Sequence, residues 1–228
     1  MGAPAPATPE SEIAMTLQTE HPVDTSPIDV AHDAPTDLDP LWRAVEPEMR
    51  TRGNDIHIPI SFAFAERLCE AYPEADSLVV RVAILLHDTG WARVDETKII
   101  SEGFGANWRQ AQIRFEHEIK GCEIAREVLP GLGYDDAFIT RVTDIIDGHD
   151  TRAESHSIED SLVRDADRLW RFNPAGIALA SSWFGQTPSF YCRRLRTEIL
   201  PELITAAGLE MATVELDRAE ALLKVAVL

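Results

Sequence analysis

The chain has 228 residues, of which 45% are hydrophobic, so it can bury the core of one domain with or without a tail. Its net charge of −18 disfavours a nucleic-acid polymer as a partner, because an acidic surface repels the phosphate backbone. No apolar run approaches the roughly 20 residues that a membrane-spanning helix requires, which argues against membrane insertion. Cys69, Cys122 and Cys192 are widely spaced and the amino terminus lacks a secretory signal pattern, so we expect a soluble cytoplasmic protein.

Residues 1–40 differ in composition from the rest of the chain. They hold seven of the fourteen prolines and eight acidic residues, but neither Lys nor Arg. Such a segment buries too little apolar surface to offset the entropy lost on ordering. We therefore predict a disordered acidic tail over 1–40 and a folded domain over 41–228.

From residue 41 onward the apolar residues follow a helical period and strand-like alternation is missing, which predicts an all-α fold. Pro73 ends the second predicted helix, Ser77 is the expected N-cap of the third, and Ser157 and Asn173 are expected to cap later ones. The expected helices cover about 41–51, 58–72, 77–87, 107–129, 136–147, a segment after Ser157, 174–184, 188–206 and 210–227. The last two carry no recognised motif and are interpreted as packing surface, with a homodimer left open.

Residues 89–106 contain three glycines and no sustained period, so they are predicted to form the longest connection of the folded part. Loops longer than about 12 residues are often binding loops. This one directly follows His87 and Asp88, and we expect it to cover them.

Histidines and acids recur at the ends or on the inner faces of the predicted helices. His117 lies in the same stripe as Gly121 and Ile124, and His149 continues the apolar stripe of its own helix. A single such histidine is more often a hydrogen-bonded core residue than a ligand, but several inward histidines and acids without a cation would each need a separate partner. The predicted metal ligands are His57, His87, Asp88, His117, His149 and Asp167.

The ligand types narrow the choice of metal. Imidazoles mixed with carboxylates suit Mn, Fe, Co, Ni or Zn better than Mg or Ca, which prefer oxygen ligands. Six ligands exceed the four of a tetrahedral zinc site. We therefore expect two divalent transition-metal ions bridged by Asp88.

The ordered pattern His57, His87-Asp88, His117, His149 and Asp167 resembles the HD-domain superfamily of metal-dependent phosphohydrolases, over about residues 53–172. The resemblance implies an HD-type helical bundle, and it implies that Asp167 rather than Asp165 is the final ligand. The additional pair His117 and His149 is similar to the two-metal subset of the superfamily.

The resemblance also implies a reaction. We expect hydrolysis of a phosphomonoester or phosphodiester in a small, nucleotide-like or similar substrate by a metal-bridging hydroxide, with Asp88, Lys120 and Arg52 as the catalytic candidates. Arg109, Arg114 and Arg168 are further candidates for binding phosphate, although such side chains usually only solvate a helix.

Two alternatives remain at this stage. A minority of HD-domain proteins that carry six ligands use a mixed-valence di-iron centre to oxidise a C–H bond, and spacing does not separate the two chemistries. A non-catalytic domain that keeps the metal as a structural element is the third class.

The aromatic residues near the pattern depart from many relatives. Trp91 stands close to a position where many HD proteins have a substrate-contacting Lys, and Trp170 occupies a place where many have Asp. Together with Phe104, Trp108 and Trp183 they are expected mainly in the core, with a pocket for an apolar or planar group left open.

Overall fold

The computed structural model describes residues 16–29, 37–103 and 111–225. Within these ranges the regular elements are helices, and the one β-type contact is an isolated bridge between Leu17 and Thr205, so the all-α prediction is confirmed. The α-helices are α1 Asp39–Val45, α2 Asn54–Ala71, α3 Ser77–Leu86, α4 Glu96–Gly103, α5 Gln112–Val128, α6 Asp136–Ile146, α7 Ile158–Leu169, α8 Pro174–Trp183, α9 Pro188–Arg194 and α10 Ala206–Val225.

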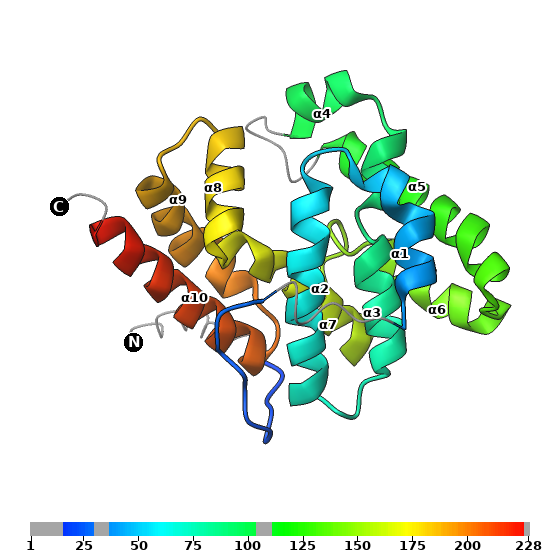
Figure 1. Ribbon diagram of the computed structural model, residues 1–228, viewed down its shortest axis with the longest axis horizontal. Helices are drawn as coiled ribbons and strands as arrows, with labels where there is room; N and C mark the ends of the chain where they lie inside the picture. The colour runs from blue at the N-terminus through cyan, green and yellow to red at the C-terminus, as the bar shows by residue number, and fades with distance from the viewer. Residues whose placement is uncertain (1–15, 30–36, 104–110, 226–228) are drawn as a thin grey trace, which may run out of the picture.

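Helix α2 lies near the centre of the molecule and packs against α3 and α7, which also contact each other (Figure 1). Helices α5 and α6 extend this group on one side, and α8, α9 and α10 form the other side. Buried aliphatic and aromatic residues from both sides belong to one continuous core. Burial of that apolar surface is the main stabilising contribution to the fold.

Several helix ends follow the sequence signals. Ser157 accepts a hydrogen bond from the backbone N–H of Asp160, and Asn173 accepts one from Ala175 before α8. The N-cap of α3 differs from the prediction, because Asp76 and not Ser77 accepts from the backbone N–H of Val79. A carboxylate one residue earlier satisfies the same orphan donor.

The predicted connection 89–106 contains more regular structure than expected. A short 3-10 helix, η2, covers Thr89–Arg93, and α4 follows it. Trp91 and Ile99 are buried with Ile113 of α5 in a small separate cluster. The prediction of a long connection was wrong for residues 89–103, because these few apolar residues pack against another helix, which a short window cannot reveal; residues 104–106 lie outside the described ranges.

Part of the predicted tail contacts the folded domain. The backbone N–H of Leu17 donates to Ile204, and Thr19 Oγ1 donates to the carbonyl of Ala71 at the end of α2. Arg67 of α2 donates to the carbonyls of Ser26 and Pro27. Residues 16–29, which we call the amino-terminal segment, therefore have specific partners that their composition did not predict.

The last helices are more broken than expected. After α9 the chain passes through a π turn at Leu195–Ile199 and a 3-10 turn at Leu200–Glu202 before α10 begins. The position of Pro201 explains the interruption, because proline supplies no backbone N–H donor. In the described part of the chain, no helix is both long and apolar enough to cross a membrane.

Candidate metal centre

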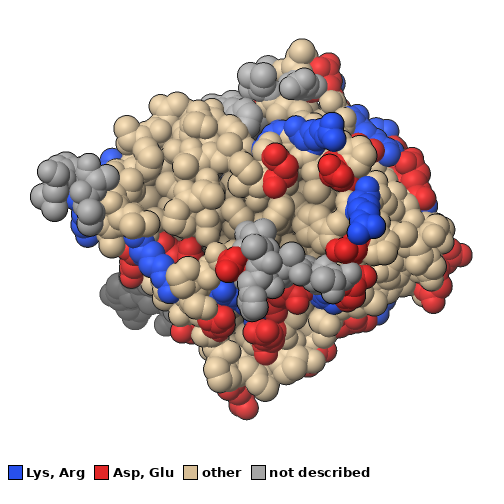
Figure 2. Space-filling model, viewed as in Figure 1, with Lys and Arg blue, Asp and Glu red and all other residues tan. Residues whose placement is uncertain are grey.

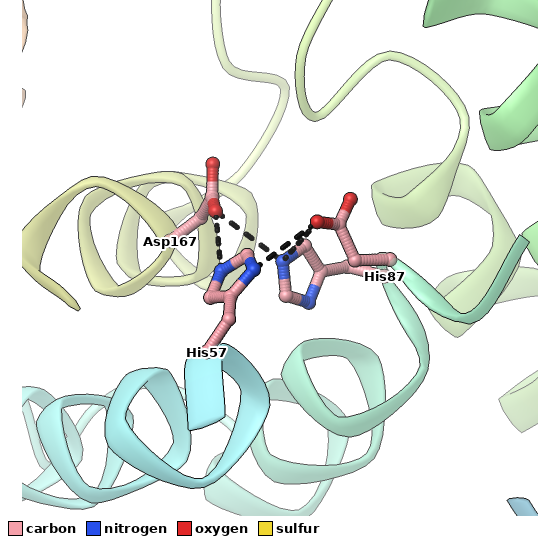
Figure 3. Close-up of side chains that lie close together, drawn as sticks. His57, His87 and Asp167 are labelled. Atoms are coloured by element: carbon pink, nitrogen blue, oxygen red, sulfur yellow. Dashed lines mark hydrogen bonds and ion pairs between the residues drawn. The ribbon is translucent and has the colours of Figure 1, made fainter. Parts of the chain in front are cut away.

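The first part of the candidate centre joins α2, the end of α3 and α7. His57 lies in the first turn of α2, its Nε2 is 3.0 Å from Oδ1 of Asp167, and its Nδ1 is 3.2 Å from Oδ2 of Asp88. His87 follows α3 and places Nε2 3.3 Å from the same oxygen of Asp167. Figure 3 shows the two imidazoles and the Asp167 carboxylate converging from three segments.

The second part joins α5 to the turn after α6. Oδ1 of Asp88 is 3.3 Å from Nε2 of His117 and 3.5 Å from Nε2 of His149. The two Nε2 atoms are 3.4 Å apart. Asp88 therefore belongs to both groups, with one carboxylate oxygen facing each.

Local backbone structure orients two of the imidazoles. Nδ1 of His87 is 2.6 Å from the carbonyl of Ile84, and Nδ1 of His149 is 2.8 Å from the carbonyl of Ile146. Each contact spans three residues at the carboxyl end of a helix, where carbonyls lack helical partners. If Nδ1–H donates to these carbonyls, Nε2 is left as the metal-binding nitrogen, a common arrangement around metal-ligating histidines.

A close backbone contact holds His87 and Asp88 against α5. A Cβ atom on Gly90 would lie 1.9 Å from the carbonyl oxygen of His117 and 2.4 Å from the backbone nitrogen of Gly121. Only glycine allows η2 to approach α5 this closely. The sequence His87-Asp88-Thr89-Gly90 thus brings the paired ligands next to His117.

Trp91 and Trp170 pack directly against the candidate ligands. Trp91 donates from Nε1 to Oδ1 of Asp88 at 2.9 Å and stacks on His117 with ring centroids 4.0 Å apart. Trp170 stacks on His57 at 4.5 Å. Both indoles are buried, as expected, while Trp183 is half-buried and Phe104 and Trp108 lie outside the described residues.

The six side chains fit a divalent metal ion. They are 0–6% exposed, so they share a water-poor site. Around a first-row ion with ligand bonds of about 2.1 Å, neighbouring ligand atoms lie about 3.0 Å apart in an octahedron and about 3.4 Å apart in a tetrahedron. The contacts of 3.0–3.5 Å described above match these edges.

The buried carboxylates and imidazoles of the site shift one another's pKa values. Burial opposes ionisation of Asp88, but the charge of His87 and the hydrogen bonds from neighbouring imidazoles hold the pKa of Asp88 well below its usual range. Burial likewise opposes protonation of His149, yet its contacts with Asp88, Asp150 and Glu118 raise its pKa to about 10. Without a cation, a protonated His149 therefore balances part of the carboxylate charge.

The other sequence candidates lie at different distances from this cluster. The guanidinium of Arg52 lies 4.0 Å from the ring centroid of Trp91, beside the cluster. Lys120 lies on the partly exposed face of α5, where its Nζ is 2.8 Å from Glu123, and the structure does not bring it to the cluster. Arg109 lies outside the described residues.

Asp150 and a neighbouring cavity were not identified from the sequence. Oδ2 of Asp150 is 4.0 Å from Nε2 of His117, and its Oδ1 is 2.5 Å from Arg114. A cavity of about 380 Å³ is lined by Asp150, Asp167 and several arginines. The adjacency of Asp150 to His149 was the available signal, but acidic neighbours of histidine are too common to be read alone.

The fold and the site define an all-helical protein with a buried His and Asp cluster able to bind metal ions. The family model for the HD domain matches residues 55–171, more than half of the chain. The chain therefore belongs to the HD domain family, the superfamily of metal-dependent phosphohydrolases. Comparison with curated proteins and with solved structures gave no match.

Proposed function

We propose that this protein hydrolyses a phosphomonoester or phosphodiester in a small substrate, with two divalent transition-metal ions held at the cluster. The position of Asp88 carries the proposal. Its two carboxylate oxygens face separate groups of ligands, one with His57, His87 and Asp167 and the other with His117 and His149. Asp88 would therefore be a ligand shared by the two ions, with one carboxylate oxygen available to each group.

The donor set supports Mn, Fe, Co, Ni or Zn as the bound ions, since imidazole ligands suit these metals better than Mg or Ca. When bound, two such ions acidify a water molecule and neutralise charge on a phosphoryl group. The six side chains divide into groups of four and three that share Asp88. Those groups leave room for water and substrate around ions with five or six ligands.

The residues around the cluster have distinct tasks in this proposal. Trp91 fixes the orientation of Asp88 through its indole N–H, and Arg52 places positive charge beside the same indole. Asp150 and Arg114, which are ion-paired, line the cavity together with Asp167 of the cluster, and this cavity would receive the substrate. Arg52 and Arg114 are therefore better placed than Lys120 to contact a phosphoryl group.

A small substrate also agrees with the surface. On the face shown in Figure 2, the described Lys and Arg residues form small groups among acidic ones rather than one continuous basic surface. Binding of a nucleic-acid polymer depends mainly on cations that neutralise successive phosphates. We therefore propose that the phosphate enters a confined cavity as part of a small molecule.

The test combines metal analysis with an activity screen. The purified protein is assayed for bound metal and then, with Mn, Fe, Co, Ni or Zn, against phosphomonoesters and phosphodiesters. We expect Asp88→Ala to lose both metal and hydrolysis, whereas Asp144→Ala, at an exposed position of α6, keeps both. Asp88→Ala with undiminished metal and turnover would refute the proposal. Oxygen consumption by the iron-loaded protein without any ester hydrolysis would indicate the di-iron oxygenase chemistry instead.

A further inference from the structure

The cavity beside Asp167 is strongly cationic although the whole chain carries a charge of −18. Its volume of about 380 Å³ lies at the lower end of the range for small-ligand sites. Five arginines from α5, the turn after α6, α7 and the following 3-10 turn line it: Arg114, Arg152, Arg164, Arg168 and Arg171. The acidic residues in its wall are fewer, and Asp167 among them already belongs to the candidate metal centre.

Three of the arginines have carboxylate partners. Arg114 is 2.5 Å from Asp150, and Arg152 is 3.1 Å from the buried Asp160. Arg168 lies farther, at 3.7 Å, from Glu202. These contacts explain why three cations are tolerated in the cavity wall without a ligand.

Arg164 makes no ion pair with a carboxylate among the described residues, although Asp160 and Asp165 of the same helix lie near enough to act on its charge. Its side chain is 4% exposed, and its Nη2 donates to the backbone carbonyl of Arg152 at 2.7 Å. Its Nε and Nη1 are buried and have no hydrogen-bond partner among the described residues. A buried guanidinium without a carboxylate costs folding free energy unless a bound group neutralises it. Burial and the charges of Arg168 and Arg152 lower the pKa of Arg164, and Asp160 and Asp165 offset only part of this effect.

We infer that Arg164, supported by Arg168, forms an anion-binding subsite for a second acidic group of the substrate, distinct from the phosphoryl group at the metal centre. This inference rests on the proposed function, because it places the reacting phosphate at the metal centre, whose residue Asp167 lines the same cavity. The ligand chemistry is an oxyanion, either a carboxylate or a second phosphate, because a guanidinium presents parallel N–H donors to two oxygens. The substrate class is then a small phosphate ester with a second negative charge.

Matched non-hydrolysable probes test this assignment by isothermal titration calorimetry on the metal-containing protein. Ethylphosphonate and 3-phosphonopropionate differ by a terminal carboxylate, phosphonobutyrate extends the linker, and ethane bisphosphonate replaces the carboxylate by a second phosphonate. We expect at least one two-anion probe to bind about tenfold or more tightly than ethylphosphonate. If the carboxylate probes bind more tightly than ethane bisphosphonate, the subsite takes a carboxylate; if the bisphosphonate binds more tightly, it takes a second phosphate.

The variant Arg164→Met removes the charge and the N–H donors and retains an unbranched apolar side chain. It is expected to weaken binding of the two-anion probe by about tenfold to a hundredfold, the range for loss of a hydrogen bond to a charged group, and to leave ethylphosphonate unaffected. Arg43→Met is the control, because Arg43 is 80% exposed on α1. If Arg164→Met fails to fold, Arg168→Met supplies the same comparison at a less buried position of the cavity wall.

The inference is overturned if no two-anion probe is preferred by the unmodified protein, or if the arginine variants weaken both kinds of probe equally. Hydrolysis of phenyl phosphate separates this failure from that of the proposed function. Ester hydrolysis without an arginine-dependent preference retains the function and rejects the subsite. An arginine-dependent preference without hydrolysis of any ester retains the subsite and rejects the function.

Discussion

Asp165 and Asp167 stand two positions apart on α7 and have different tasks, which a pair of substitutions can separate. Residues two apart on a helix point in nearly opposite directions. Asp167 contacts His57 and His87, whereas Asp165 accepts hydrogen bonds from the backbone N–H groups of Ile204 and Thr205 at 2.9 and 2.8 Å. Oγ1 of Thr205 adds a third at 2.7 Å. Asp165 thus connects α7 to the start of α10.

We predict that Asp165→Asn lowers the free energy of unfolding by about 2 kcal/mol. Both carboxylate oxygens of Asp165 accept hydrogen bonds, but in asparagine only the amide oxygen can accept, and the NH2 group would face a backbone N–H donor. Each lost hydrogen bond to a charged group costs about 1.5–3 kcal/mol. Burial raises the pKa of Asp165, so removing a desolvated charge offsets part of this loss. For a chain of this size the melting temperature should fall by about 4–8 °C.

Differential scanning calorimetry and metal analysis of both variants provide the measurement. Asp165→Asn should melt earlier but keep its metal, whereas Asp167→Asn should lose metal with a smaller change in the melting of the metal-free protein. Loss of metal in Asp165→Asn at an unchanged melting temperature would refute this division of tasks. It would mean that Asp165, and not Asp167, is the metal ligand.

Three further predictions follow from the site. Gly90→Ala should destabilise the protein and reduce its metal content, because the added methyl group meets the backbone of α5; Gly131→Ala, where no atom lies within 4 Å, should melt like the parent. Trp91→Phe keeps an aromatic ring but removes the hydrogen bond to Asp88, so chelator competition should show about tenfold weaker metal binding; unchanged affinity would contradict the orienting task. Finally, apparent metal affinity should rise with pH between 6.5 and 8.5 by up to about tenfold per unit for each proton displaced. The reason is that His149, whose pKa is raised to about 10 in the ion-free site, must lose its proton to bind metal; a pH-independent affinity would contradict it.

The helical part of the site could be predicted from the sequence because its ligands follow the helical period. His117 shares a stripe with buried Ile124, and His149 follows the buried stripe that includes Ile145. The structure brings all six predicted ligands together, and whether they bind metal stays a prediction. The distances from Asp88 to His117 and His149 depend on how α3, α5 and α6 pack, which the sequence does not give. The expectation that these side chains all face the core was sufficient to propose a cluster.

Features that depend on contacts between distant segments could not be predicted in this way. The cationic cavity combines Arg114 of α5 with Arg164 and Arg171, and each of these resembles an ordinary surface arginine in its own sequence window. Lys120 failed to reach the cluster for the converse reason, since its neighbour Glu123 offers a local ion pair. The cytoplasmic location and a homodimer stay predictions.

The contacts of the amino-terminal segment have a practical consequence for protein production. Shortening the chain to 41–228, the boundary suggested by composition, would remove two carbonyl acceptors from Arg67, which is 8% exposed. It would also remove the acceptor at Leu17 for the phenol of Tyr72. A purification tag or protease site is therefore better placed ahead of residue 16, where these contacts are retained, than at the start of α1.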